Sequence, residues 1–119
     1  MDTVHIYCCS KRFVDEASLA SFVEPTYTDD GDMLDSDFMR EIDLSDEYEP
    51  MAIERMFLPK PTPVRAAIQD CSYSTQFADQ IPRETIADAI ICVYSPNIPQ
   101  SPSSTSVTYI GSFNYSPTA

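Results

Sequence analysis

The side chains with the greatest capacity for chemistry in this sequence are carboxylates, and most of them lie in one stretch. Twelve of the nineteen acidic residues fall between Glu24 and Glu54, where Arg40 is the only base. Carboxylates at this density can bind a cation, transfer protons in pairs, or attract a basic partner. The twelve are Glu24, Asp29, Asp30, Asp32, Asp35, Asp37, Glu41, Asp43, Asp46, Glu47, Glu49 and Glu54.

A calcium loop of the EF-hand type is excluded by its own spacing rule. Counted from Asp30, acids stand at loop positions 1, 3 and 12, but position 5 is Leu34 and the glycine needed at position 6 is Asp35. A looser cation site and a pair of proton-transferring carboxylates stay open, because a set of twelve acids always contains pairs. Neither alternative has a specific signal, and we expect no metal and no cofactor.

A nucleophilic enzyme is hard to assemble from these residues. His5 is the only histidine, and no serine sits in a glycine-rich turn of the kind that exposes a nucleophile. His5 and Cys9 would share one face of a strand, yet four strand positions separate them by about 13 Å, beyond hydrogen-bond reach. We therefore expect a binding protein without catalytic residues.

The third use of the acids, docking of a basic protein, fits their neighbours best. Aromatic and methionine side chains are interleaved with the charges, and such anchors supply affinity while charges speed association. Phe38 is the exception, since it fits a core position better; the plain alternative is that the whole run is a solvated face. We predict contacts from Tyr27, Asp29, Asp30, Asp32, Asp35, Asp37, Glu41, Asp46, Glu47, Tyr48 and Glu49.

The remaining partner classes follow from charge and composition. A net charge of −12 argues against nucleic acid and against an anionic membrane surface, because both need lysine and arginine. Four cysteines without a Cys-x-x-Cys motif, and a start that is neither basic nor apolar, favour a reducing cytoplasm. The sequence leaves the oligomeric state open.

The elements that must carry these residues begin with a strand and two helices. Residues 3–9 alternate as a strand does, with Val4, Ile6 and Cys8 on one face. Residues 16–23 form a helix that Asp15 can cap and Pro25 ends. A second helix follows Asp35 or Ser36, and it turns Phe38, Met39 and Ile42 inward just after Leu34.

The second half of the chain predicts more strands. Residues 51–58 fit a strand or a helix almost equally, residues 59–61 form a proline-rich connector, and Thr62-Pro63 predicts a helix start. Residues 87–94 predict a central strand; a further short helix is expected at residues 74–80. An exposed proline-rich loop at 95–106 then leads to a last strand at 107–115, expected to pair antiparallel with the preceding strand.

Together these elements predict one α+β domain over residues 1–119. We expect a single, mainly antiparallel sheet of three to four strands, with short helices packed on one face. The acidic segment at 24–54 would form most of the functional surface.

Several short motifs, taken in order, resemble one known family. They are Val4-His5-Ile6-Tyr7, Phe22-Val23-Glu24, the acidic run from Asp29 to Asp32 leading to Phe38, Ser72-Tyr73-Ser74, the apolar strand at 87–94, and Tyr109-Ile110-Gly111-Ser112-Phe113. In this order they are similar to the immunity protein 22 family of bacterial polymorphic-toxin systems. The sequence departs from the family pattern at Cys8-Cys9, at Pro82 and in the loop after Tyr94.

The resemblance implies a protein that binds a cognate toxin or effector in the cytoplasm and blocks its active site. The toxin could be delivered by a secretion system such as type VI, and a basic, nuclease-type toxin would complement the acidic segment. The alternative is another acidic binding module, either a nucleic-acid mimic that inhibits a nuclease or a chaperone for an effector.

Overall fold

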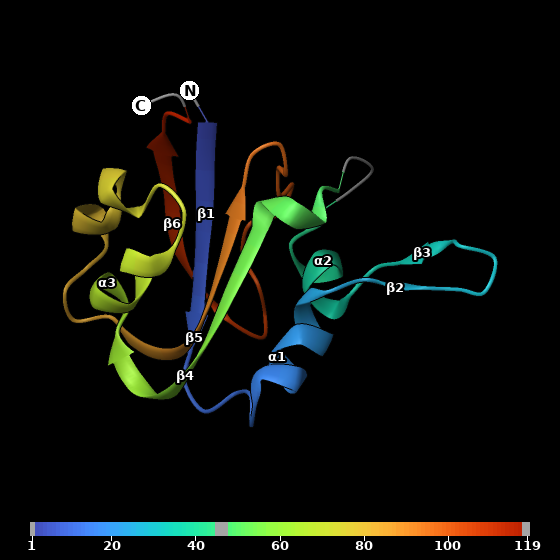
Figure 1. Ribbon diagram of the computed structural model, residues 1–119, viewed down its shortest axis with the longest axis horizontal. Helices are drawn as coiled ribbons and strands as arrows, with labels where there is room; N and C mark the ends of the chain where they lie inside the picture. The colour runs from blue at the N-terminus through green and yellow to red at the C-terminus, as the bar shows by residue number, and fades with distance from the viewer. Residues whose placement is uncertain (1, 45–47, 118–119) are drawn as a thin grey trace.

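A four-stranded antiparallel sheet forms the centre of the computed structural model, which describes residues 2–44 and 48–117 (Figure 1). The strands are β1 (Asp2–Cys9), β4 (Ile53–Pro63), β5 (Ile86–Tyr94) and β6 (Thr108–Tyr115), in the spatial order β4-β5-β1-β6. A separate two-stranded hairpin consists of β2 (Thr26–Tyr27) and β3 (Met33–Leu34). The expected α+β fold with one antiparallel sheet is confirmed.

Helices cover both faces of the sheet, where the sequence predicted one covered face (Figure 1). One face packs against α1 (Glu16–Val23) and α2 (Asp37–Glu41). The other packs against α3 (Val64–Ala67) and short 3₁₀ turns at Ile68–Asp70, Ser74–Gln76 and Ala78–Gln80. A last 3₁₀ turn, Pro50–Ala52, leads into β4. Both faces carry a core because the central strands β1 and β5 have apolar side chains on both sides.

The first two helices form as their end signals predict. The Asp15 carboxylate accepts a hydrogen bond of 2.8 Å from the backbone N–H of Ser18, and Leu19, Phe22 and Val23 are buried. Of the two capping residues considered for α2, Ser36 holds the position. Phe38 lies in the core, as expected.

Three expectations for the middle of the chain are wrong. The prolines Pro59 and Pro61 do not form a separate connector, because they lie inside β4, at a break in the pairing with β5 between Phe57 and Thr62. This edge strand tolerates them, since its outer side needs no ladder hydrogen bonds. Thr62 does not cap α3; its hydroxyl donates to the Lys60 carbonyl, and Pro63 holds the cap position. Residues 74–80 form two 3₁₀ turns rather than one helix.

The last strand also pairs differently from the prediction. β6 pairs antiparallel with β1, so the chain crosses from β5 over β1 instead of forming a hairpin. The predicted irregularity at Gly111 is confirmed, because Ile6 faces Gly111 while Tyr7 faces Tyr109, which leaves Ile110 as an extra residue. Gly111 has a φ of +151°, which glycine adopts without strain.

Candidate functional site

The hairpin formed by β2 and β3 stands off the body of the molecule (Figure 1). Tyr27 lies opposite Met33 in its two-stranded ladder, and all residues from 26 to 35 are exposed. The tip is closed by backbone hydrogen bonds of 2.9 Å, from Thr28 N–H to the Asp32 carbonyl and from Gly31 N–H to the Thr28 carbonyl. Gly31 has a φ of +87°, a conformation that favours glycine. The Thr28 hydroxyl also accepts from the Asp32 N–H at 3.1 Å, so the turn is closed without the use of its carboxylates.

The hydrogen bonds that close this turn do not involve its carboxylates, so these side chains remain available to other partners. Asp29, Asp30, Asp32 and Asp35 form no ion pair within residues 2–44 and 48–117. The nearby Arg40 guanidinium is already engaged, since it donates to the Asp35 backbone carbonyl and to the Asp37 carboxylate. The hairpin therefore carries an uncompensated negative charge on an exposed, protruding element.

Three apolar side chains on the same hairpin are exposed as well. The exposed fractions are 61% for Tyr27, 41% for Met33 and 51% for Leu34. The sequence prediction named Tyr27 but missed Met33, and it placed Leu34 beside the buried stripe of α2. The available signal was the Asp-Asp-Gly-Asp turn between Tyr27 and Met33, which is typical of a hairpin. Apolar anchors and free acids are thus combined on one element.

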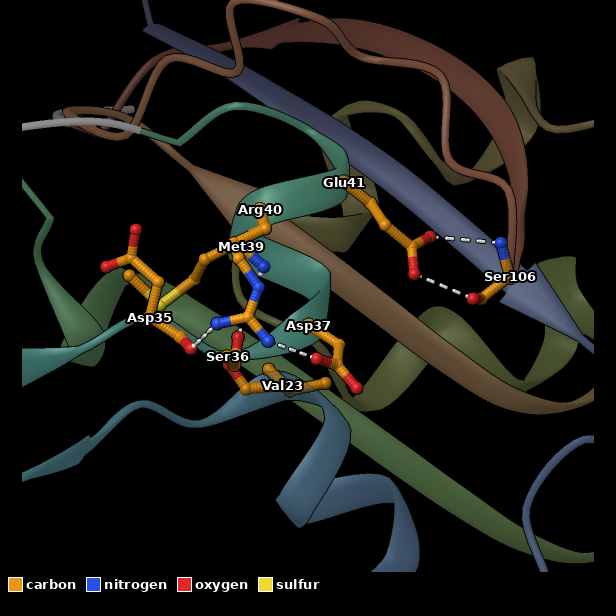
Figure 2. A network of polar contacts seen from close by, with 8 residues as sticks. All are labelled: Val23, Asp35, Ser36, Asp37, Met39, Arg40, Glu41 and Ser106. Atoms are coloured by element: carbon orange, nitrogen blue, oxygen red, sulfur yellow. Dashed lines mark hydrogen bonds and ion pairs between the residues drawn. The ribbon is translucent and has the colours of Figure 1, made fainter.

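One buried serine fastens the base of the hairpin to the body. The Ser36 hydroxyl donates to the Val23 carbonyl at 2.9 Å and accepts from the Met39 N–H at 3.1 Å (Figure 2). Ser36 thereby caps α2 and also satisfies a carbonyl at the end of α1. The two chain ends of the hairpin are held together, and its tip can project without loosening the core.

A recess of about 200 Å³ opens at this base. Its walls come from the end of α1, from β2 and from the start of β4, and they include Tyr27, Tyr48 and Glu24. Arg55 lines it too and donates to the Glu16 carboxylate at 3.0 Å and to the Glu24 carboxylate at 2.6 Å. The two tyrosines that the sequence singled out therefore meet at one recess.

The two tyrosines differ in their surroundings. Tyr27 is largely exposed, whereas Tyr48 is half-buried and packs against the core under α1 and α2. Burial raises the pKa of the Tyr48 hydroxyl to about 12, with smaller contributions from Tyr27 and Glu24. Tyr48 thus has a structural role in addition to its place in the recess.

Glu41 faces away from the hairpin and holds the proline-rich loop instead. Its carboxylate accepts hydrogen bonds from the N–H and hydroxyl of Ser106 at 3.0 and 2.7 Å (Figure 2). It also accepts from the Ser104 hydroxyl at 2.6 Å and from the Thr105 N–H at 3.1 Å. Burial alone would raise the pKa of this carboxyl, but the hydrogen bonds from these three residues outweigh burial and lower the pKa.

The same loop is tied to the acidic segment at further points. The buried Asn97 side chain accepts from the Glu49 N–H at 2.8 Å and donates to the Glu49 carbonyl at 2.9 Å. The Glu49 carboxylate in turn accepts from the Met51 N–H. The loop at 95–106 is irregular as predicted, but Asn97 and Pro99 are buried, so it is not exposed throughout. The predicted contacts Asp46 and Glu47 lie outside the described residues.

Comparison with known proteins identifies the family. A family profile described as Immunity protein 22 matches residues 4–116. The chain belongs to the immunity protein 22 family. Comparison with curated proteins and with solved structures gave no match.

Membership supports a role in toxin immunity for this protein and implies that it binds a cognate toxin. Immunity proteins of this family are in general not enzymes. The resemblance drawn from the short sequence motifs is thus confirmed over nearly the whole chain. None of the helices within residues 2–44 and 48–117 is long and apolar enough to cross a membrane.

The other reactive side chains of this immunity protein are engaged in packing. His5 Nδ1 lies 2.9 Å from the Tyr109 hydroxyl, and burial lowers the pKa of its imidazole. Burial also raises the pKa of the Cys9 thiol to about 11, with Asp88 adding to the shift, so this thiol is a poor nucleophile near neutral pH. In the described part of the chain, no group of three or more histidine, cysteine or acidic residues is placed to hold a metal ion.

Proposed function

We propose that this immunity protein neutralises its cognate toxin by binding it through the β2–β3 hairpin and the recess at the base of the hairpin. The observation that carries the proposal is the continuous exposure of residues 26–35, which include three large apolar side chains. Exposed apolar groups surrounded by charge are typical of protein-binding surfaces. Here the charges are the carboxylates of Asp29, Asp30, Asp32 and Asp35, which form no ion pair in the described part of the chain.

The chemistry of this surface favours a basic toxin. Uncompensated carboxylates on a protruding turn would attract a positively charged cleft and raise the rate of association, typically by ~10- to 10³-fold. A cleft that binds nucleic-acid phosphates is basic, so the hairpin could enter it with carboxylates in the place of phosphates. The proposed toxin is therefore of the nuclease type, and the proposed mechanism is occlusion of its active site.

The recess would fix the position of the complex after the first encounter. Tyr27 and Tyr48 offer aromatic surface, and Glu24 places a carboxylate beside them. Such a site suits one long or aromatic side chain of the toxin, and buried contacts of this kind dominate the affinity of protein interfaces. Asp37 remains a predicted contact, because its ion pair with Arg40 lies on an exposed turn of α2. We leave Glu41 and Glu49 out of the proposed surface, because their carboxylates accept hydrogen bonds within the chain.

We place this encounter in the bacterial cytoplasm, where the toxin would reach its target. The four thiols, which form no disulfide, suit a reducing compartment. The proposal requires no cofactor and assigns no catalytic residue to the chain.

A charge-reversal experiment with a matched control tests the proposal. The variant Asp29→Lys/Asp30→Lys/Asp32→Lys should slow association with the toxin by about 100-fold and abolish growth rescue on co-expression, because steering reverses sign. The control Asp70→Lys/Asp79→Lys/Glu84→Lys alters net charge equally at exposed sites outside the hairpin, and it should keep rescue.

The toxin for this assay is the product of the neighbouring gene, captured by co-purification. Equal urea midpoints for both triple variants would show that the fold is retained. Full rescue by the hairpin variant would refute the role of the hairpin. A neighbouring gene that encodes a secreted protein without toxicity would favour an effector chaperone instead.

A further inference from the structure

The two edges of the main sheet differ in how they are protected from pairing with another strand. The outer strand β4 carries Pro59, Lys60 and Pro61, and prolines and lysines are devices that block edge pairing. The opposite edge, β6, reads Thr-Tyr-Ile-Gly-Ser-Phe-Asn-Tyr and contains no proline and no charged residue. β6 does have the bulge at Ile110, but the stretch from Gly111 to Tyr115 pairs with β1 in regular register.

The outer side of β6 is free of the protein's own backbone. Within residues 2–44 and 48–117, its ladder partner is β1 alone, and no loop adds a backbone hydrogen bond to it. Thr108, Ser112 and Asn114 are exposed along the strand. An edge of this kind presents unpaired N–H and C=O groups to any strand that can reach it.

The charge around β6 indicates which molecule supplies the strand that pairs with this edge. The chain has a net charge of −12, yet residues 95–119 contain no acidic and no basic residue. A basic toxin gains no attraction at this neutral edge. A second copy of the chain, in contrast, meets an identical neutral strand and escapes the repulsion that the acidic segments would impose elsewhere. An antiparallel strand pair satisfies the two-fold symmetry of a dimer, which needs a self-complementary patch.

We propose that two copies of this protein pair along β6, joining their sheets into one continuous antiparallel sheet. The regular stretch from Gly111 to Tyr115 would form the contact, with Phe113 near the two-fold axis and Ser112 facing Asn114 of the second copy. Phe113 already stacks on Phe77, with ring centroids 6.1 Å apart, so the centre of the contact is rigid.

The position of β6 keeps the dimer compatible with toxin binding. The β2–β3 hairpin projects on the side of the molecule that carries α1 and α2, and it does not lie against β6 (Figure 1). The dimer would thus leave both hairpins uncovered. The inference does not depend on the proposed function, and dimerisation could fail while toxin binding persists.

Sedimentation velocity on the full chain tests the inference, from micromolar to submillimolar concentrations and over a range of salt. Dimerisation should strengthen as salt rises, because screening weakens the repulsion between two acidic bodies. Toxin binding through the hairpin should weaken over the same range. A chain that stays monomeric at the highest concentration and salt would overturn the proposal.

A double variant locates the interface. Ser112→Lys/Asn114→Lys places two lysines opposite those of the second copy and should weaken dimerisation at least tenfold, since directly opposed like charges destabilise strand pairs. The control Ser21→Lys/Ser101→Lys adds the same charge at exposed sites away from residues 111–115 and should dimerise as the wild type does. Equal dimerisation of both variants would refute the role of β6.

Hydrogen exchange on the wild-type chain gives an independent measurement that needs no substitution. The amides of residues 111–115 should exchange more slowly at high than at low protein concentration, while hairpin amides should not change. If exchange is independent of concentration in β6, or if the lysine pair abolishes toxin binding while leaving a dimer intact, the proposal is wrong.

Discussion

The acidic segment consists of two halves that use their carboxylates in opposite ways. In the hairpin half, residues 25–35, main-chain hydrogen bonds close the turn and the carboxylates of Asp29, Asp30 and Asp32 point to solvent. In the second half, Glu41 and Glu49 accept hydrogen bonds from the chain, and Asn97, Ser104 and Ser106 tie this half to the proline-rich loop.

The difference shows that a count of acids does not locate a binding surface. A carboxylate that already accepts several hydrogen bonds is committed to the fold, and removing it costs stability. A carboxylate without donors contributes little to the fold and remains available to a partner. Both halves are rich in acids, and the sequence does not distinguish them; the hydrogen-bond donors around each carboxylate separate structural acids from candidate contacts.

The largest effect is expected from the aromatic anchor of the hairpin. Tyr27→Ala should lower toxin affinity by about 2 kcal/mol or more, as for a central interface aromatic, while the free energy of unfolding stays within about 0.5 kcal/mol because the side chain is exposed. Titration calorimetry and urea unfolding measure the two quantities. Tyr48→Ala is the contrasting variant, since it should lose both affinity and stability. Unchanged toxin affinity in Tyr27→Ala would show that the hairpin does not contact the toxin.

A smaller effect of opposite kind is expected at Glu41. Glu41→Gln should lower the free energy of unfolding by about 1.5 kcal/mol, because the loop donors lose a charged acceptor. Growth rescue should persist, since Glu41 faces the loop. Urea unfolding at neutral pH gives the free energy of unfolding. Loss of rescue in a folded Glu41→Gln protein would show that Glu41 contacts the toxin and is not only a structural acid.

The stability difference between wild type and Glu41→Gln should depend on pH. The pKa of the Glu41 carboxyl is lowered in the folded state, so its contribution is fully present above the unfolded value of about 4.3 and is lost as pH falls through the folded pKa. The two urea midpoints should therefore converge below about pH 4. A difference that stays constant into acid would assign the loss to packing instead.

The smallest effect is expected from neutralising the hairpin. Asp29→Asn/Asp30→Asn/Asp32→Asn should change the free energy of unfolding by no more than about 0.5 kcal/mol, because these side chains are exposed and form no ion pair in the described residues. Thermal unfolding measures it. A large loss would mean that these acids, like Glu41, are structural.

Local patterns predicted the elements better than their arrangement. Alternation identified β1, the apolar run identified β5, and cap residues located α1 and α2. The order of the sheet was missed because the proximity of β5 and β6 along the chain favours a hairpin. The actual partners, Thr3 and Asn114, are 111 positions apart, and no local signal reports such a pairing.

The distribution of charge located the candidate site in the sequence, but it did not show which acids of the segment are available to a partner. The sequence showed where the acids gather, and it identified Tyr27 and Tyr48, which share the recess. It could not separate Glu41 from the hairpin acids, because the donors to Glu41 come from Ser104 to Ser106, more than sixty positions later. Met33 was missed because the Asp-Asp-Gly-Asp turn was not interpreted as a hairpin, which would have placed Met33 opposite Tyr27.

The central place of β1 has a consequence for synthesis in the cell. β1 is made before both of its neighbours, β5 and β6, which follow only after α1, α2, β4 and α3. Until then an apolar strand with two open sides has no native partner, and contacts so distant along the chain form slowly. We therefore expect the main sheet to close only after β6 has left the ribosome, so that protection begins with a delay set by this strand.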